Sequence, residues 1–184
     1  DHYTLVRNDN YWGEMPIATS ITCRVIPEGS ARTIALEAGE IDVVWSVDPT
    51  DCANVESNPD VKLLSQPSTG IDYVGMNTQK EKFSDKRVRQ AINYALDKQT
   101  FVDTIIEGRG LVANSYINAA IPGWTDEVEA YPYDPAKAKE LLAEAGYPNG
   151  FECKIYVNGD VRTRSAQIIQ AQLAEVGITV DIST

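Results

Sequence analysis

The chain has 184 residues, of which 43% are hydrophobic and 23% are charged. This is ordinary globular composition, and the length is enough to bury at least one core. The formal net charge of −11 repels phosphate backbones and anionic lipid head groups, and no apolar run approaches the roughly 18 residues of a membrane-spanning helix. The basic run from Lys80 to Arg89 is interrupted by acidic residues and is typical of a solvated helix face. We therefore expect no nucleic-acid partner.

The chain opens with two segments that have the alternating pattern of neighbouring strands. Residues 2–8 (HYTLVRN) form the first. Residues 20–26 (SITCRVI) form the second, which places three apolar side chains on one face: Ile21, Cys23 and Val25. We expect the two strands to pair.

A helix–glycine–strand unit follows. Helical spacing relates Ala31, Ile34, Ala35 and Ala38, and Gly39 stands where a left-handed helix stop belongs. Residues 41–45 (IDVVW) predict a short buried strand. Residues 48–57 predict a helix with Pro49 in its first turn, and residues 61–66 (VKLLSQ) predict another strand.

Residues 70–79 (GIDYVGMNTQ) predict an extended segment, and a pair of helices follows it. Ser84 or Asp85 can cap the first helix, whose apolar stripe is Val88, Ala91, Ile92, Ala95 and Leu96. Asp97 caps the second helix, and Leu96 and Phe101 are spaced to form a hydrophobic staple that fixes the angle between the helices. The second stripe is Phe101, Val102, Ile105 and Ile106. The pair would form a stiff brace for the extended segment.

The last third predicts a long irregular stretch and then a helix–strand–helix–strand order. The irregular stretch contains Trp124, and loops of such length are usually functional or poorly ordered. Asp134 and Pro135 begin the clearest helix, and Gly146 ends it. Residues 151–158 and 178–182 predict strands around a helix that ends at Gly177, with its apolar face at Ala166, Ile169, Leu173 and Val176. The predicted fold class is α/β, a mixed β-sheet with packed helices.

No group in the chain indicates catalysis. The only histidine, His2, lies beside the chain start, where we expect a mobile terminus, and motifs for metallopeptidases, hydrolase elbows, dinucleotides and nucleotide phosphates are missing. Cys23, Cys52 and Cys153 are widely spaced, which suits buried small side chains and leaves one disulfide possible among them. We expect no cofactor and no metal site.

Aromatic and amide side chains gather instead in and beside the extended segments. Such residues can line a cleft that binds a small ligand, although any one of them alone is more often a half-buried residue of a sheet or loop. They are Tyr73, Asn77, Asn114, Tyr116, Trp124, Tyr131, Tyr133, Tyr156 and Asn158.

Four segments together resemble one known family. They are RNDNYWGEMPIATSITCRVIPEGSARTIALEAGEIDVVW, YVGMNTQKEKFSDKRVRQAINYALDKQTFVD, DPAKAKELLAEAGYPNGF and AQLAEVGITVDI. This set resembles the middle of the family 5 extracellular solute-binding proteins, the dipeptide, oligopeptide and nickel type that feed ABC importers. The match runs along nearly the whole chain.

The resemblance implies a two-lobed periplasmic-binding-protein fold of the type II-like kind. Residues 1–69 would be the end portion of the larger lobe and residues 70–184 part of the second lobe, with a strand crossing between them near Gly70. By similarity, the cleft residues would be Gly70, Ile71, Asp72, Tyr73, Asn77, Asn114, Ser115, Tyr116, Asn158 and Asp160. An extended peptide could pair with the backbone there as an added strand.

The resemblance also implies the partners and the location. The ligand would be a peptide or another small solute, such as a nickel complex, glycan or opine, and the docking partner would be an ABC permease in the membrane. The protein would work in the periplasm or outside the cell, possibly tethered by a lipid. Export signals would lie outside this chain.

In peptide-binding relatives an aspartate beyond the strand that matches ITVDI holds the ligand's amino group. The sequence ends at Thr184, before that segment, so we expect a fragment with parts of both lobes and half a binding site, which could self-associate through uncovered core residues. Two other functions stay open: a hydrolase acting on peptides or glycans, and a chaperone-like module that holds extended polypeptide.

Overall fold

A computed structural model describes residues 1–184, which fall into two compact units, Asp1–Leu63 and Leu64–Thr184. Each unit is described by itself. The first contains β1 (His2–Val6), β2 (Ser20–Arg24), α1 (Gly29–Glu37), a 3-10 turn η1 (Pro49–Asp51) and α2 (Cys52–Ser57). The second contains α3 (Glu81–Ser84), α4 (Lys86–Ala95), α5 (Lys98–Thr104), α6 (Pro135–Glu144), β3 (Glu152–Tyr156), α7 (Asp160–Glu175) and β4 (Thr179–Ser183).

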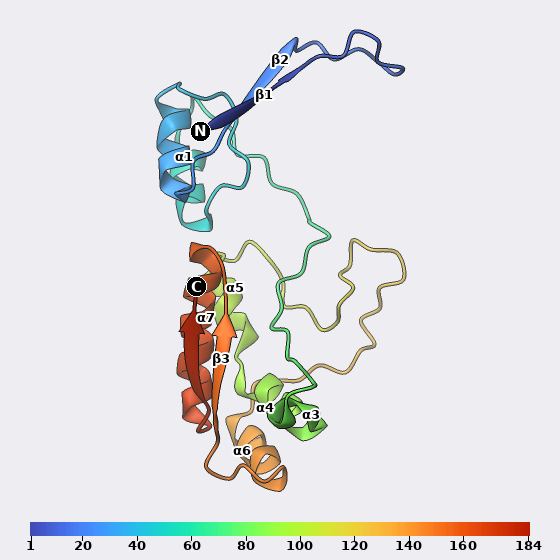
Figure 1. The fold of residues 1–184 in the computed structure, drawn as a ribbon, viewed down its shortest axis with the longest axis vertical. Coiled ribbons are helices and arrows are strands. Elements are labelled where there is room, and N and C mark those ends of the chain that lie inside the picture. Colours follow the sequence, from blue (N-terminus) through green and yellow to red (C-terminus); the bar gives the residue numbers. More distant parts are fainter. The chain divides into compact units, whose positions relative to one another are not determined.

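The first unit is a long hairpin followed by two short helices (Figure 1). The predicted pairing of the first two strands is confirmed: β1 and β2 are antiparallel, with Tyr3 opposite Cys23. His2 lies within β1 rather than in a mobile terminus. Helix α1 ends as predicted at Gly39, whose φ of 72° is left-handed. Its predicted face is partly wrong, because Ile34 is exposed while Thr33 and Ala35 are buried.

Two predicted strands of the first half do not form. Residues 41–45 and 61–66 belong to no sheet, and Val43, Trp45 and Leu64 are 78%, 90% and 80% exposed. A strand exists only when a neighbour pairs with its backbone, and no segment of the chain pairs with these residues. The apolar side chains of these two segments therefore remain exposed to solvent.

The core of the second unit lies between α4, α6, α7 and β4. Helix α4 packs against α6, and α7 packs against β4, which pairs in parallel with β3 (Figure 1). The predicted stripe of α4 is confirmed, since Val88, Ala91 and Ala95 are at most 1% exposed. Of the predicted face of α7, Ile169, Leu173 and Val176 belong to the same cluster as Leu142 and Ile178, and Ala166 is also buried. This cluster is the hydrophobic core of the second unit.

The α/β class is confirmed, but the strands form two separate two-stranded sheets rather than one mixed sheet. All three cysteines are free thiols, and Cys23 and Cys153 are only partly buried, so the predicted burial holds for Cys52 alone. None of the helices has both the length and the apolar character needed to traverse a lipid bilayer.

Candidate functional site

Residues 71–76 form an unpaired extended stretch, which we call the open segment. No main-chain N–H or C=O of these six residues takes part in a hydrogen bond within the chain, and no sheet includes them. The stretch predicted as a strand near Gly70 is extended chain without a strand partner, because no other segment lies alongside to complete a ladder. Unpaired backbone at an exposed edge is a template for an added strand.

Hydrogen bonds hold both ends of the open segment in place. At the start, the Gly70 amide donates to Ser68 Oγ (2.9 Å), and Asn118 Nδ2 donates to the carbonyl oxygens of Ser68 (3.0 Å) and Gly70 (3.3 Å). At the end, the Asn77 carbonyl accepts from the Lys80 amide (3.0 Å), and the Asn77 side chain accepts from the Gln79 amide (3.0 Å). The main-chain groups in the middle of the open segment are therefore free to bind a ligand, while its two ends are held in place.

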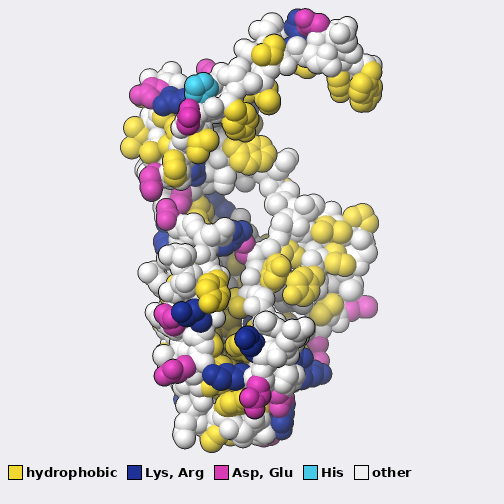
Figure 2. All heavy atoms as spheres, in the orientation of Figure 1, with side chains coloured by type: hydrophobic (Ala, Val, Ile, Leu, Met, Phe, Trp, Pro, Cys, Tyr) yellow, Lys and Arg dark blue, Asp and Glu magenta, His cyan; other side chains and the backbone are white.

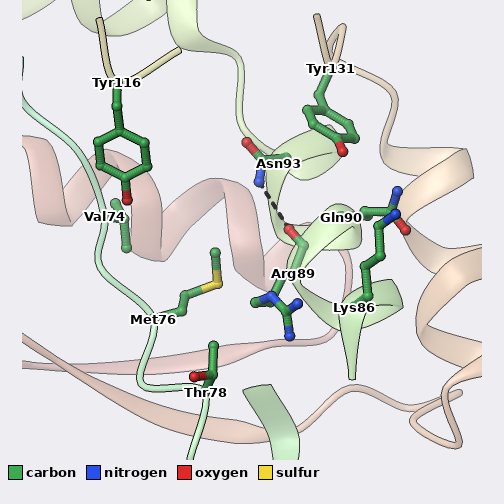
Figure 3. A pocket seen from close by; sticks show the side chains of 9 residues that line it. All are labelled: Val74, Met76, Thr78, Lys86, Arg89, Gln90, Asn93, Tyr116 and Tyr131. Carbon is green, nitrogen blue, oxygen red and sulfur yellow. Dashed lines mark hydrogen bonds between the residues drawn. The ribbon is translucent and has the colours of Figure 1, made fainter. Parts of the chain in front are cut away.

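A pocket of about 400 Å³, which we call the α4 pocket, lies beside the open segment (Figure 3). Val74, Met76 and Thr78 line it from one side. These residues are two apart, as expected when alternate side chains of an extended chain point the same way. Helix α4 and two loop tyrosines complete the lining with Lys86, Arg89, Gln90, Asn93, Tyr116 and Tyr131.

Tyr73 pairs with Tyr116 rather than joining the pocket lining. The two ring centroids are 5.4 Å apart with the planes at 65°, an edge-to-face contact that gives up little of either ring's exposed area. Tyr73 remains 67% exposed and Tyr116 75% exposed. The structure therefore brings together two residues predicted for the cleft and leaves their rings available to a ligand.

A polar cluster joins two other predicted residues through an arginine that the sequence analysis missed. Arg162 in the first turns of α7 donates to Asn158 Oδ1 (2.9 Å) and lies 3.5 Å from Asp72 Oδ1. A basic side chain near a helix N-terminus opposes the helix dipole, and this local conflict was the signal that could have identified it. Asp72 and Arg162 are both well exposed, so the pair contributes little stability and stays available for other partners.

The remaining predicted residues lie elsewhere. Asn114 lines a second pocket of about 260 Å³ together with Tyr131 and Tyr133. Ser115 Oγ closes a local turn by donating to the Ile117 carbonyl (2.7 Å), and Asp160 is the first residue of α7. The structure does not gather these side chains with the Tyr73 pair.

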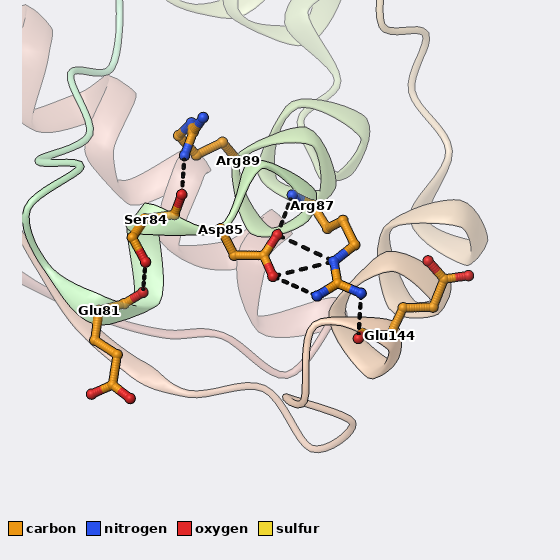
Figure 4. Close-up of polar contacts among 6 residues, drawn as sticks. All are labelled: Glu81, Ser84, Asp85, Arg87, Arg89 and Glu144. Atoms are coloured by element: carbon orange, nitrogen blue, oxygen red, sulfur yellow. Dashed lines mark hydrogen bonds and ion pairs between the residues drawn. The ribbon is translucent and has the colours of Figure 1, made fainter.

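Hydrogen bonds tie helices α3, α4 and α6 together (Figure 4). The Asp85 carboxylate caps α4 by accepting from the Arg87 amide (2.8 Å), and it also pairs with the Arg87 guanidinium (2.6 Å). Arg87 Nη1 reaches the Glu144 carbonyl at the end of α6 (2.7 Å), and Arg89 Nη1 donates to the Phe83 and Ser84 carbonyls. The hydrogen bonds from Arg87 keep the pKa of Asp85 below its usual range.

Lys98 ties the loop before α6 to the end of α4. Its Nζ donates to the Asn93 carbonyl (2.9 Å) and to the Tyr131 carbonyl (3.0 Å), and burial lowers the pKa of the ammonium group. The Tyr131 ring packs edge-on against Tyr94 at 5.3 Å. Tyr131 is therefore a fixed wall between the two pockets.

A family model described as bacterial extracellular solute-binding proteins, family 5 middle, matches residues 1–184. Heme-binding protein A of Haemophilus influenzae is 37% identical over 94% of the chain and 33% of its own length. The dipeptide-binding protein of Escherichia coli is 33% identical over 96% of the chain and 34% of its own length. The chain thus spans about a third of the length of these relatives.

Solved structures give the same result. The periplasmic binding protein DppA of Helicobacter pylori, in complex with the peptide STSA, matches with a TM-score of 0.93 and 34% identity over 100% of this chain and 36% of its own. The oligopeptide-binding protein AppA of Bacillus subtilis, in complex with a nonapeptide, matches with a TM-score of 0.86 and 29% identity over 99% of this chain and 39% of its own.

Proposed function

The chain belongs to the family 5 bacterial extracellular solute-binding proteins, and from this premise we propose that it is part of the solute-binding component of an ABC importer. The protein would capture a peptide or a related small solute in a cleft between two lobes and deliver it to a membrane permease. Residues 1–69 would belong to the larger lobe and residues 70–184 to the second. The protein would act outside the cytoplasmic membrane, either free in the periplasm or held by a lipid.

The observation that carries this proposal is the open segment. Six consecutive residues present unpaired amides and carbonyls in an extended stretch whose two ends are fixed. A peptide lying alongside would add a strand, and every main-chain hydrogen bond it makes would be independent of its side chains. Such a site suits cargo that varies in sequence.

Side chains beside the open segment would supply the remaining contacts. The exposed rings of Tyr73 and Tyr116 form an apolar shelf for a ligand side chain. The guanidinium of Arg162, already near Asp72 and Asn158, can donate to a ligand carboxylate in place of these exposed partners. The brace from α3 to α6 keeps this surface preorganised, which reduces the entropy cost of binding.

Capture would use hinge closure and no covalent chemistry. A ligand shifts the balance between open and closed states only by its difference in affinity for the two, so contacts from both lobes must improve on closure. We infer that the protein is not an enzyme, since its relatives are named as binding proteins and the open segment needs only main-chain pairing.

The test is a calorimetric titration of the natural-length protein with tetra-alanine and with tetra-alanine methylated at two internal amides. Methylation removes N–H donors while it keeps the peptide's length and charge. We expect saturable binding of the parent peptide, and binding about tenfold weaker for the methylated one, because each backbone hydrogen bond contributes about 1 kcal/mol. Equal affinity for the two peptides would contradict main-chain pairing.

Mass spectrometry of the same samples separates the rival functions. Peptide recovered intact after saturation supports transport, whereas cleaved peptide identifies a hydrolase. Binding of unfolded protein without saturable binding of any short peptide, nickel chelate or oligosaccharide identifies a chaperone-like module.

A further inference from the structure

The α4 pocket has two cationic side chains in its lining, of which Arg89 also lies near the Asp85 carboxylate outside the pocket. Lys86 and Arg89 line it, and neither aspartate nor glutamate does, although the chain as a whole has a formal net charge of −11. The Lys86 ammonium group makes no hydrogen bond or ion pair within the chain. An unneutralised cation in a concave site raises the local concentration of anions.

Several hydrogen-bond donors of the pocket have no partner within the chain, whereas Asn93 Nδ2 donates to the Arg89 carbonyl (3.0 Å). Arg89 uses Nη1 for the Phe83 and Ser84 carbonyls (2.7 and 2.9 Å), which fixes the guanidinium and leaves Nε and Nη2 free. The Gln90 amide and the Thr78 hydroxyl make no hydrogen bond within the chain. In Figure 3 the arginine lies between α4 and the open segment, with Thr78 across from it. A planar guanidinium held in place suits a carboxylate, which can accept two parallel hydrogen bonds.

The opposite part of the pocket is apolar. Val74 and Met76 extend from the open segment, and the rings of Tyr116 and Tyr131 stand at one end (Figure 3). A volume of about 400 Å³ exceeds the need of a bare inorganic anion and suits a small organic body. Donors and apolar surface therefore meet within one pocket.

We propose that the α4 pocket binds a carboxylate carried on a small apolar body. Lys86 and Arg89 hold the carboxylate with Thr78 as an added donor, and the apolar body lies against Met76 and the tyrosine rings. The carboxylate comes either from a free small acid or from the side chain of a peptide on the open segment. The pocket's own geometry carries this inference, which does not require the transport function.

The test measures binding of 3-phenylpropionate and its neutral isostere 3-phenylpropionamide to the natural-length protein by ¹⁵N chemical-shift titration. We expect 3-phenylpropionate to shift the backbone amide signals of Thr78, Arg89 and Gln90 in a saturable way. The affinity for 3-phenylpropionamide should be at least fivefold weaker. Lys86→Ala should weaken the binding of 3-phenylpropionate about fivefold, as expected for the loss of one charge-assisted contact at a partly exposed site. Lys139→Ala removes the same charge from an exposed position outside the pocket and should change the affinity less than twofold.

A second substitution and a pair of peptides test the same pocket independently. Thr78→Val removes one hydrogen-bond donor. Because Thr78 is exposed and lies outside any helix or strand, we expect the variant to fold. It should weaken the binding of 3-phenylpropionate two- to threefold. Tetrapeptides with glutamate or glutamine at one position identify the source: a Lys86-dependent preference for glutamate assigns the carboxylate to a peptide, and Lys86-dependent binding of the free acid assigns it to a separate ligand. Equal binding of acid and amide, together with no glutamate preference, overturns the proposal.

Discussion

Asp97 shows how a single side chain sets the geometry around the candidate site. It follows Leu96, the buried residue that ends α4, and it caps α5. Its Oδ1 accepts from the Gln99 amide (3.1 Å), and its Oδ2 accepts from the Thr100 hydroxyl (2.7 Å). Because the cap fixes where α5 begins, it also fixes the angle at which the chain leaves α4.

Replacing Asp97 by alanine should lower the free energy of unfolding of the second unit by about 1 kcal/mol, since the first amides of α5 lose their acceptor. Chemical denaturation followed by tyrosine or tryptophan fluorescence measures the change. Asp126→Ala is the matched control, because Asp126 is exposed and makes no hydrogen bond within the chain. A loss in Asp97→Ala no larger than in the control would show that the cap does not stabilise α5.

The same cap predicts a pH dependence. The hydrogen bonds from Thr100, and from the amides of Thr100 and Gln99, lower the pKa of the Asp97 carboxyl. A lowered folded-state pKa adds stability that is complete above the unfolded-state pKa of about 3.9 and is lost as the pH falls through the folded-state pKa. Asp97→Asn keeps the acceptor but does not titrate. We expect the wild type to lose stability relative to Asp97→Asn on going from pH 6 to pH 3, and a pH-independent difference would contradict this cause.

Sequence reasoning succeeded at this scale where the signal is local. The caps Asp97 and Asp134 and the helix stop at Gly146 are as predicted, and Asp85 is one of the two caps predicted for α4, because each acts within a few residues of itself. The sequence could identify Arg162 by its place near the start of a helix, but it could not predict its partner. Its partner Asp72 lies 90 residues away, and only the fold brings the two together.

At the scale of elements, α4 and α6 form the support of the open segment. Val88, Ala91 and Ala95 of α4 face Leu142 and Ala138 of α6 in one buried cluster. Small residues at these positions let the two helices approach closely, and Arg87 ties the end of α6 to the start of α4. Movement of α6 would therefore displace α4 and the pocket.

Leu142→Ala should lower the free energy of unfolding of the second unit by about 2–5 kcal/mol, since the side chain is buried and its loss leaves a cavity. Thermal and chemical denaturation measure the change. Leu111→Ala removes the same atoms from a side chain that is 90% exposed and should change the stability by less than about 0.5 kcal/mol. Similar losses in both variants would mean that α6 is not part of the core.

The elements that sequence analysis misplaced share one physical property. Helices α4, α6 and α7 satisfy their own backbone and were predicted correctly from apolar spacing. Residues 41–45 and 61–66 have the composition of strands. A strand also requires a neighbouring strand, and the local sequence does not show whether another segment will pair with it. Predicted strands whose neighbours were also found, such as β1 with β2, are confirmed.

At the scale of the whole chain, many large apolar side chains lie on the surface. They include Trp12, Ile17 and Trp45, which are 90%, 100% and 90% exposed. Figure 2 shows hydrophobic side chains gathered at the tip of the β1–β2 hairpin. Surfaces of this kind usually mark an interface.

We therefore expect the 184-residue chain to associate with itself as its concentration rises, because burial of these side chains would be favourable by about 25 cal/mol per Å² of apolar area. Light scattering coupled to size exclusion measures the mass across a concentration series. The double variant Trp12→Ser and Ile17→Ser should shift association to higher concentration, and Glu14→Ser, a polar change in the same loop, should not. A monomeric mass at every concentration would contradict this expectation.

The central claim is that residues 71–76 offer unpaired main chain to an extended guest, and residue-resolved hydrogen exchange tests it most directly. Without ligand, the amides of residues 71–76 should exchange at close to unprotected rates, while the amides of the α4 and α6 core stay protected. When the natural-length protein is saturated with tetra-alanine, alternate amides of the segment should slow at least tenfold, because only every second N–H of a strand faces a given neighbour. Slow exchange without ligand, or unchanged exchange at demonstrated saturation, would contradict the account.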